Sequence, residues 1–142
     1  MSKPIVKVAC GLLVMLVAIG SLAGCGGKLP EPGYADQMTE EAMWALNDGD
    51  YTGFLQYFSP DSRSALDEEN FNTQRQNIKV AFGDYISKEY WRTTTQDSYT
   101  VVEYTADFSG TSEEIIISVY FEEIDGEIYI AGFWVRAPSS GG

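Results

Sequence analysis

Apolar residues follow three different patterns along this chain, and each pattern predicts a different structure. A continuous apolar run covers residues 8–19. Between residues 35 and 82, apolar residues recur every three or four positions, which is the spacing of helices that bury one side. From residue 85 onward they alternate with polar residues, as in half-buried strands. The sequence therefore predicts an apolar N-terminal segment, then helices, then strands.

The helical part divides into three predicted helices, of which two come before residue 60. The first starts near Ala35 and ends before Gly49, because glycine suits the left-handed position after a helix. Asp50 can cap a second helix over residues 51–58, and Pro60 closes it. The residues expected on the buried side of the first helix are Ala35, Met38, Ala42, Ala45 and Leu46.

The third predicted helix begins after its cap, Asp67, and ends at Gly83. Acidic residues fill its first turn, where negative charge is favourable. The apolar residues on one side of this helix are Phe71, Ile78, Ala81 and Phe82. The pattern predicts that this stripe is buried against the rest of the domain.

Four antiparallel strands are predicted after Gly83. They cover residues 85–93, the stretch from the turn at 96–98 to Phe108, residues 114–123 and residues 127–136. The dipeptide at 125–126, Asp-Gly, is a strong hairpin signal between the last two. Three helices followed by this sheet give an α+β fold class.

The alternation assigns the second and third strands an apolar inner face and a polar outer face. The predicted inner residues are Val102, Tyr104, Ala106 and Phe108, followed by Ile115, Ile117, Val119 and Phe121. Glu103 and Asp107 point the other way, so we expect both carboxylates to be solvated. No carboxylate falls within either apolar face, and no catalytic residue is assigned.

The last two strands differ because both of their faces are apolar. The second apolar face is predicted to hold Ile116, Tyr120, Tyr129 and Phe133. A sheet with one solvated face does not need this pattern, so something is expected to cover it. The prediction is an interface, either in a homodimer or with another protein of the cell envelope.

The N-terminal segment reads as an export signal. Lys3 and Lys7 precede the apolar run, which is shorter than the roughly 20 residues a spanning helix needs. Residues 22–25, Leu-Ala-Gly-Cys, resemble the lipobox of prokaryotic lipoproteins. The resemblance implies that Cys25 carries lipid and becomes the first residue, on the extracytoplasmic side of a cell membrane or outer membrane. The predicted division is signal peptide 1–24, lipidated cysteine and flexible tether 25–33, domain 34–138 and tail 139–142.

Charge and composition exclude several functions. The formal net charge is −12, and it becomes −14 when Lys3 and Lys7 leave with the signal, which argues against nucleic acid as a partner. The chain has no histidine and only two cysteines, Cys10 in the signal and Cys25. We therefore expect no metal site, no cofactor and no disulfide in the mature domain. Asp48 and Asp50 imitate the start of a calcium loop, but serine stands where the twelfth position needs glutamate.

The order of elements resembles the nuclear transport factor 2-like superfamily, a cystatin-like group whose curved sheet forms a cone around its helices. The stretch 47–51, Asn-Asp-Gly-Asp-Tyr, is similar to that family's junction between its first two helices, and residues 125–133 are similar to its closing hairpin. Within the superfamily, the chain is most similar to exported prokaryotic domains known as domain of unknown function 3887. This resemblance implies a cone-shaped fold.

Some members of that superfamily are enzymes, such as ketosteroid isomerase-like proteins with carboxylates and tyrosines inside the cone. The predicted inner faces here offer aromatic residues instead, and the candidates for a ligand pocket are Tyr57, Trp91, Tyr104 and Trp134. The alternative is that these four residues only pack in the hydrophobic core. The sequence favours a lipid-anchored, extracytoplasmic interaction or small-ligand-binding module without catalysis. The alternative is a small enzyme of isomerase or hydrolase type acting in the cone pocket.

Overall fold

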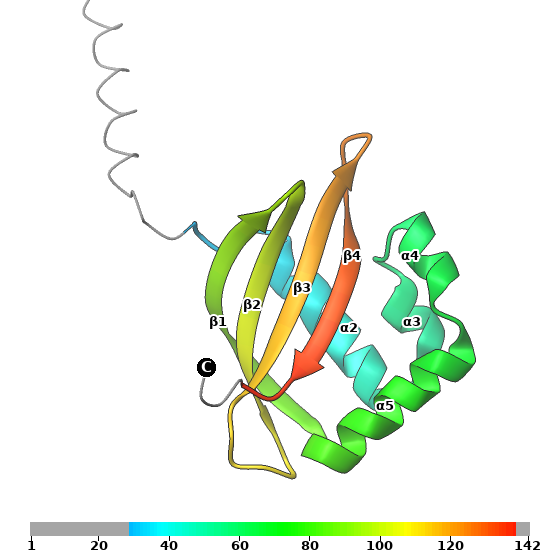
Figure 1. The fold of residues 1–142 in the computed structure, drawn as a ribbon, viewed down its shortest axis with the longest axis vertical. Coiled ribbons are helices and arrows are strands. Elements are labelled where there is room, and N and C mark those ends of the chain that lie inside the picture. The colour runs from blue at the N-terminus through cyan, green and yellow to red at the C-terminus, as the bar shows by residue number, and fades with distance from the viewer. Residues whose placement is uncertain (1–28, 139–142) are drawn as a thin grey trace, which may run out of the picture.

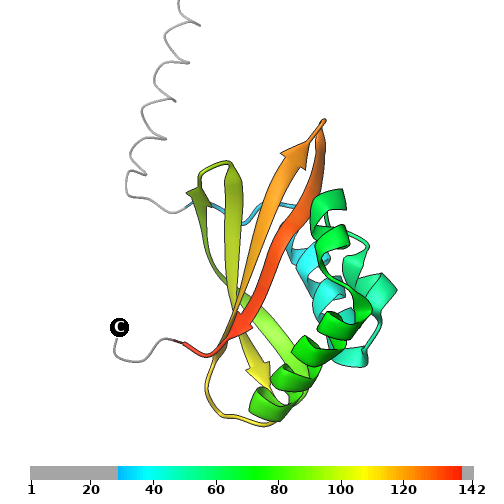
Figure 2. The same ribbon diagram turned by 45° about the vertical axis from the view of Figure 1, so that its right-hand side comes forward.

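The computed structural model describes residues 29–138, a four-stranded antiparallel sheet preceded by helices. The helices are α2 (Ala35–Asp48), α3 (Tyr51–Leu55), α4 (Pro60–Ala65) and α5 (Glu68–Phe82). The strands are β1 (Tyr85–Gln96), β2 (Tyr99–Phe108), β3 (Ile115–Ile124) and β4 (Glu127–Arg136), in that order across the sheet. The sheet is curved and open, and the helices lie on one of its faces, here called the inner face (Figures 1 and 2). The α+β class is therefore confirmed.

The predictions for the N-terminal segment concern residues outside the described part of the chain. These are the signal peptide, the lipobox and the lipid site Cys25. Within residues 29–138, none of the helices has the length and apolar character needed to cross a membrane.

The predicted helix ends are confirmed by their hydrogen bonds. Asp50 accepts a hydrogen bond from the Gly53 amide at 3.0 Å at the start of α3. Asp67 accepts one from the Asn70 amide at 2.8 Å at the start of α5. Each carboxylate satisfies an amide that has no partner inside its helix, which fixes where the helix begins.

The prediction of three helices is wrong, because the described residues form four. The second helix ends at Leu55, and Ser59 caps an additional helix, α4, by accepting a hydrogen bond from the Ser62 amide. Pro60 opens α4 because the first helical position does not need an amide hydrogen. Ahead of α4, the backbone joins the edge of β4, where the Ile130 amide donates to the Tyr57 carbonyl at 2.7 Å.

The inner face of the sheet holds the core. All eight apolar residues predicted for the inner faces of β2 and β3 are buried, and they pack against the buried side of α2. Tyr104 and Phe121 are among the largest fully buried side chains. Alternation in β2 and β3 was therefore sufficient to predict which residues face the helices.

A bulge in β4 overturns the predicted faces of its C-terminal half. Tyr120 pairs with Gly132 and Phe121 pairs with Ile130, so Ala131 is an extra residue. Every side chain after it is moved to the opposite face. Phe133, predicted on the outer face, lies on the inner face with its ring centroid 5.4 Å from that of Phe54. Trp134, predicted in an inner pocket, has its ring on the outer face.

The outer face carries a buried carboxylate that was predicted to be solvated. Glu103 is only 6% exposed. It accepts hydrogen bonds from Ser118 at 2.7 Å, Arg92 at 2.5 Å and Arg136 at 2.9 Å. Burial raises the pKa of Glu103, but the hydrogen bonds from Ser118 and Arg92 and the two guanidinium charges outweigh burial and lower the pKa below its ordinary value. This cluster joins side chains from all four strands.

Candidate ligand cleft between α5 and β4

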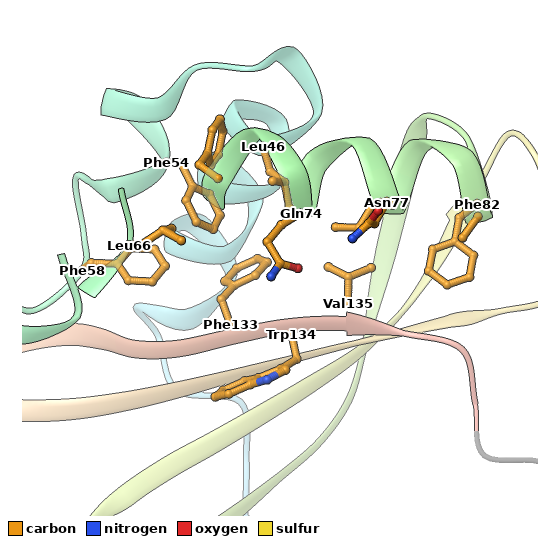
Figure 3. A pocket seen from close by; sticks show the side chains of 13 residues that line it. Leu46, Phe54, Phe58, Leu66, Gln74, Asn77, Phe82, Phe133, Trp134 and Val135 are labelled. Atoms are coloured by element: carbon orange, nitrogen blue, oxygen red, sulfur yellow. The ribbon is translucent and has the colours of Figure 1, made fainter. Parts of the chain in front are cut away.

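An apolar cleft opens between α5 and β4 on the inner side of the sheet (Figure 3). Its volume is about 430 Å³, within the range of small-molecule sites. Its aromatic walls come from α3 and the segment after it, from α5 and from β4. The main apolar lining residues are Phe54, Phe58, Phe71, Phe82, Phe133 and Val135.

The cleft exists because α5 is held at its two ends and by hydrogen bonds to the end of α2, but is not packed against β4 in between. Near its start, Phe71 packs against Phe54 with ring centroids 5.3 Å apart. At its end, the Gly110 amide donates to the Phe82 carbonyl at 2.7 Å. Between these points, Ile78 is only half-buried and Ala81 is exposed, and both line the cleft. The stripe predicted to be buried is thus partly open to solvent.

The polar groups of the cleft are uncharged amides. Gln74 and Asn77 extend from α5 toward β4 (Figure 3). Each carboxamide can donate and accept hydrogen bonds. None of the described residues that line the cleft carries an ionisable side chain. The cleft therefore offers apolar contact and hydrogen bonding, and its own side chains offer no general acid or base.

The structure does not bring the four predicted pocket residues together. Tyr57 donates to Glu41 at 2.6 Å, which raises the pKa of Tyr57 and lowers that of Glu41. Tyr104 is fully buried, and its hydroxyl donates to Glu31 at 2.8 Å. Trp91 is exposed on β1 at the far edge of the sheet.

Trp134 alone of the four borders the cleft, but its ring lies on the other side of β4 (Figure 3). The cleft residues that sequence reasoning missed include Gln74 and Asn77. The signal that could have found Gln74 is its position three residues after Phe71 and four before Ile78, within the apolar stripe. A polar residue on such a stripe indicates that the stripe is not wholly packed.

The predicted outer-face interface is altered by the bulge. Ile116 is buried within the domain, whereas Tyr120 and Tyr129 are half-buried. Trp134 takes the place of Phe133 and is 52% exposed, with its ring centroid 5.0 Å from that of Tyr120. Pairing with a second copy or with an envelope protein stays a prediction, and sedimentation of the unlipidated domain would test the homodimer.

Metal and disulfides are not expected to contribute to stability. Among residues 29–138, no three acidic or cysteine side chains are grouped as a metal site requires. Asp50 is occupied as a helix cap. We expect the thermal midpoint of the mature domain to be unchanged by a chelator or by a reductant. A clear fall in the midpoint with chelator alone would restore the calcium interpretation of Asp48 and Asp50.

The fold and the cleft together define a small α+β domain with an open apolar site between a helix and an edge strand. Residues 39–133 match the model of the family described as "Protein of unknown function (DUF3887)". The match covers more than half of the chain, so this chain belongs to the DUF3887 family. This confirms the likeness to domain of unknown function 3887 that was drawn from the sequence.

None of the curated proteins matches this sequence. Among solved structures, the chain is similar to Bd1075 of Bdellovibrio bacteriovorus, with 8% identity and a TM-score of 0.44. The similarity covers 73% of this chain and 39% of Bd1075, so the chain corresponds to well under half of that protein.

Proposed function

We propose that this protein is a lipid-anchored module on the extracytoplasmic side of a cell membrane or outer membrane, and that it binds a small apolar ligand in the α5–β4 cleft. The observation that carries the proposal is an open apolar cleft that, among the described residues, is lined by apolar side chains and the amides of Gln74 and Asn77, with no ionisable group. The lipobox at residues 22–25 supports the anchor.

Binding is favoured over the isomerase or hydrolase alternative by the chemistry of the cleft. Proton transfer requires an ionisable group within hydrogen-bond reach of the substrate. Two carboxylates that make short hydrogen bonds do not line the cleft. Glu103 is held on the outer face, and Glu41 accepts a hydrogen bond from Tyr57. The lining residues instead suit a ligand held by apolar contact and oriented by Gln74 and Asn77.

The size of the cleft and the charge of the protein limit which ligands can bind. Covering about 200 Å² of apolar ligand surface contributes about 5 kcal/mol before association costs, which is equivalent to a dissociation constant of about 0.2 mM at best and predicts weak binding. The mature chain would carry a net charge of −14, which disfavours anionic ligands. We therefore propose a neutral or cationic ligand with a ring or short alkyl body.

We also infer that the fold is of the nuclear transport factor 2-like type. Support comes from the helices preceding the sheet, the bulged closing strand and a cleft between a long helix and the sheet. In that superfamily the cone interior is where ligands are held, which agrees with the proposed use of the cleft.

The anchor is tested by labelling cells with a radioactive fatty acid. We expect the wild-type protein to be labelled and to sediment with membranes, and the Cys25→Ser chain to lose the label. Intact mass of the mature protein should place Cys25 first. Equal label in both chains would refute attachment at Cys25.

Binding is tested on the chain from residue 25 with Cys25→Ser, using the neutral fluorescent probe N-phenyl-1-naphthylamine. The variant Ala81→Trp puts an indole into the cleft and should weaken probe binding by about tenfold or more. Val80→Trp is the matched control, because Val80 is the neighbouring residue of α5, is 77% exposed and does not line the cleft. Equal weakening in both variants would argue against the cleft as the site.

A further inference from the structure

Three exposed apolar side chains lie at the edge strand β1, where the described chain begins. Tyr90 packs against Tyr104 on the inner face of the sheet, and Trp91 lies beside Arg92 on the outer face. Leu29, Tyr90 and Trp91 are 44%, 37% and 41% exposed. The Tyr90 hydroxyl donates to the Leu29 carbonyl at 2.9 Å, which holds the start of the chain against β1. Trp91 is the extra residue of a bulge in β1. These three residues are called the β1 patch.

The contacts of Leu29 and Glu31 shorten the tether that was predicted to reach residue 33. Glu31 accepts a hydrogen bond from the hydroxyl of the buried Tyr104. The chain is therefore held to the sheet from Leu29 onward. Only residues 26–28 separate Leu29 from Cys25 in the sequence. Four fully extended steps of chain span at most about 14 Å. A lipid on Cys25 would therefore keep Leu29, and with it this edge of the sheet, within about 14 Å of the point of anchoring.

We propose that the β1 patch lies in the headgroup region of the bilayer and sets the orientation of the domain on the membrane. This inference rests on the proposed lipid anchor. The headgroup region is about 6 Å thick on each side, a depth that the short connection can reach. Tyrosine and tryptophan favour this region because their rings are apolar and their polar atoms remain hydrated.

The charges near the patch are compatible with a neutral lipid surface. The Arg92 guanidinium lies 4.1 Å from the Trp91 ring centroid, and half of its side chain remains open to solvent. Glu89 is exposed on the same strand, and its negative charge would be repelled by a strongly anionic surface. Phosphatidylcholine, which has no net charge, is therefore the lipid for the test.

The orientation has a consequence for the cleft. The strands β1 and β4 are the two edges of the sheet, so they lie about 14 Å apart across three strand spacings. The cleft borders β4, while the β1 patch and the start of the described chain lie at the other edge (Figure 1). A ligand would then enter from the aqueous side and not from the lipid.

The proposal is tested on the full lipidated protein in phosphatidylcholine vesicles that contain a lipid with a spin label on its headgroup. Two variants each keep one informative tryptophan. Trp44→Phe with Trp134→Phe leaves Trp91, and Trp44→Phe with Trp91→Phe leaves Trp134. We expect the spin label to quench Trp91 at least about threefold more than Trp134, because only Trp91 faces the headgroups.

Flotation of the vesicles separates the outcomes. If the protein floats with the vesicles and both tryptophans are quenched equally or not at all, the orientation is wrong and the anchor stands. If the protein does not float, the proposed lipid anchor is refuted, and so is the orientation that depends on it. Thermal midpoints close to the wild-type value show that both variants fold, which is expected because the three tryptophans are exposed.

Discussion

Replacing Gly83 with alanine is expected to lower the free energy of unfolding by about 3 kcal/mol or more. Gly83 has φ 92° and ψ −149°, a conformation that only glycine adopts readily. A Cβ atom there would lie 2.4 Å from the Gly110 amide nitrogen and 2.9 Å from its Cα. That amide already donates to the Phe82 carbonyl, so relieving the clash breaks the contact that fixes the end of α5.

The measurement is urea unfolding of the unlipidated domain, with Gly126→Ala as the matched control. Gly126 also has a positive φ, 85°, but its Cβ would meet nothing within 4 Å. The control should lose only about 1 kcal/mol, the cost of the backbone conformation. A similar loss in both variants would contradict the close approach at Gly83. Because α5 forms one wall of the cleft, Gly83→Ala should weaken probe binding as well.

The second large effect is expected from Glu103→Gln, which should cost about 2 kcal/mol at pH 7. The amide keeps the volume of the side chain but loses the charge that Arg92 and Arg136 share. It also cannot accept all three hydrogen bonds at two oxygens as the carboxylate does. Glu89→Gln is the control, because Glu89 is exposed on β1 and should lose almost nothing.

The pH dependence distinguishes this account from a simple packing defect. The folded-state pKa of Glu103 is lowered below its unfolded-state value, so folding is stabilised at pH values above the unfolded-state pKa. That stabilisation is lost as the pH falls through the folded-state pKa. The stability difference between wild type and Glu103→Gln should therefore shrink below about pH 5. A difference that stays constant from pH 7 to pH 3 would show that charge at Glu103 does not matter.

Local sequence signals were sufficient for most element boundaries. The caps Asp50 and Asp67 and the stops Gly49 and Gly83 act through hydrogen bonds and backbone angles within a few residues. The last strand, Glu127–Arg136, also has the predicted bounds. The short helix α4 was missed because Ser-Pro both ends one helix and begins another.

Long-range effects could not be predicted in the same way. The bulge at Ala131 depends on how β4 pairs with β3, and one extra residue exchanged the faces of Phe133 and Trp134. Glu103 alternates correctly to the outer face, but its burial depends on arginines from β1 and β4. The cleft was missed because periodicity reports which side of a helix is apolar and not how closely that side is packed.

The central claim is that the α5–β4 cleft binds a small apolar ligand, and nuclear magnetic resonance tests it at the residues concerned. The side-chain amides of Gln74 and Asn77 are reporters at the cleft, and that of Gln96 at the end of β1 is the control. On titration with N-phenyl-1-naphthylamine, we expect the first two resonances to shift together and saturate with the probe's fluorescence, while Gln96 is unchanged. If the probe binds while Gln74 and Asn77 do not move, or if it does not bind at all, the account of the cleft is contradicted.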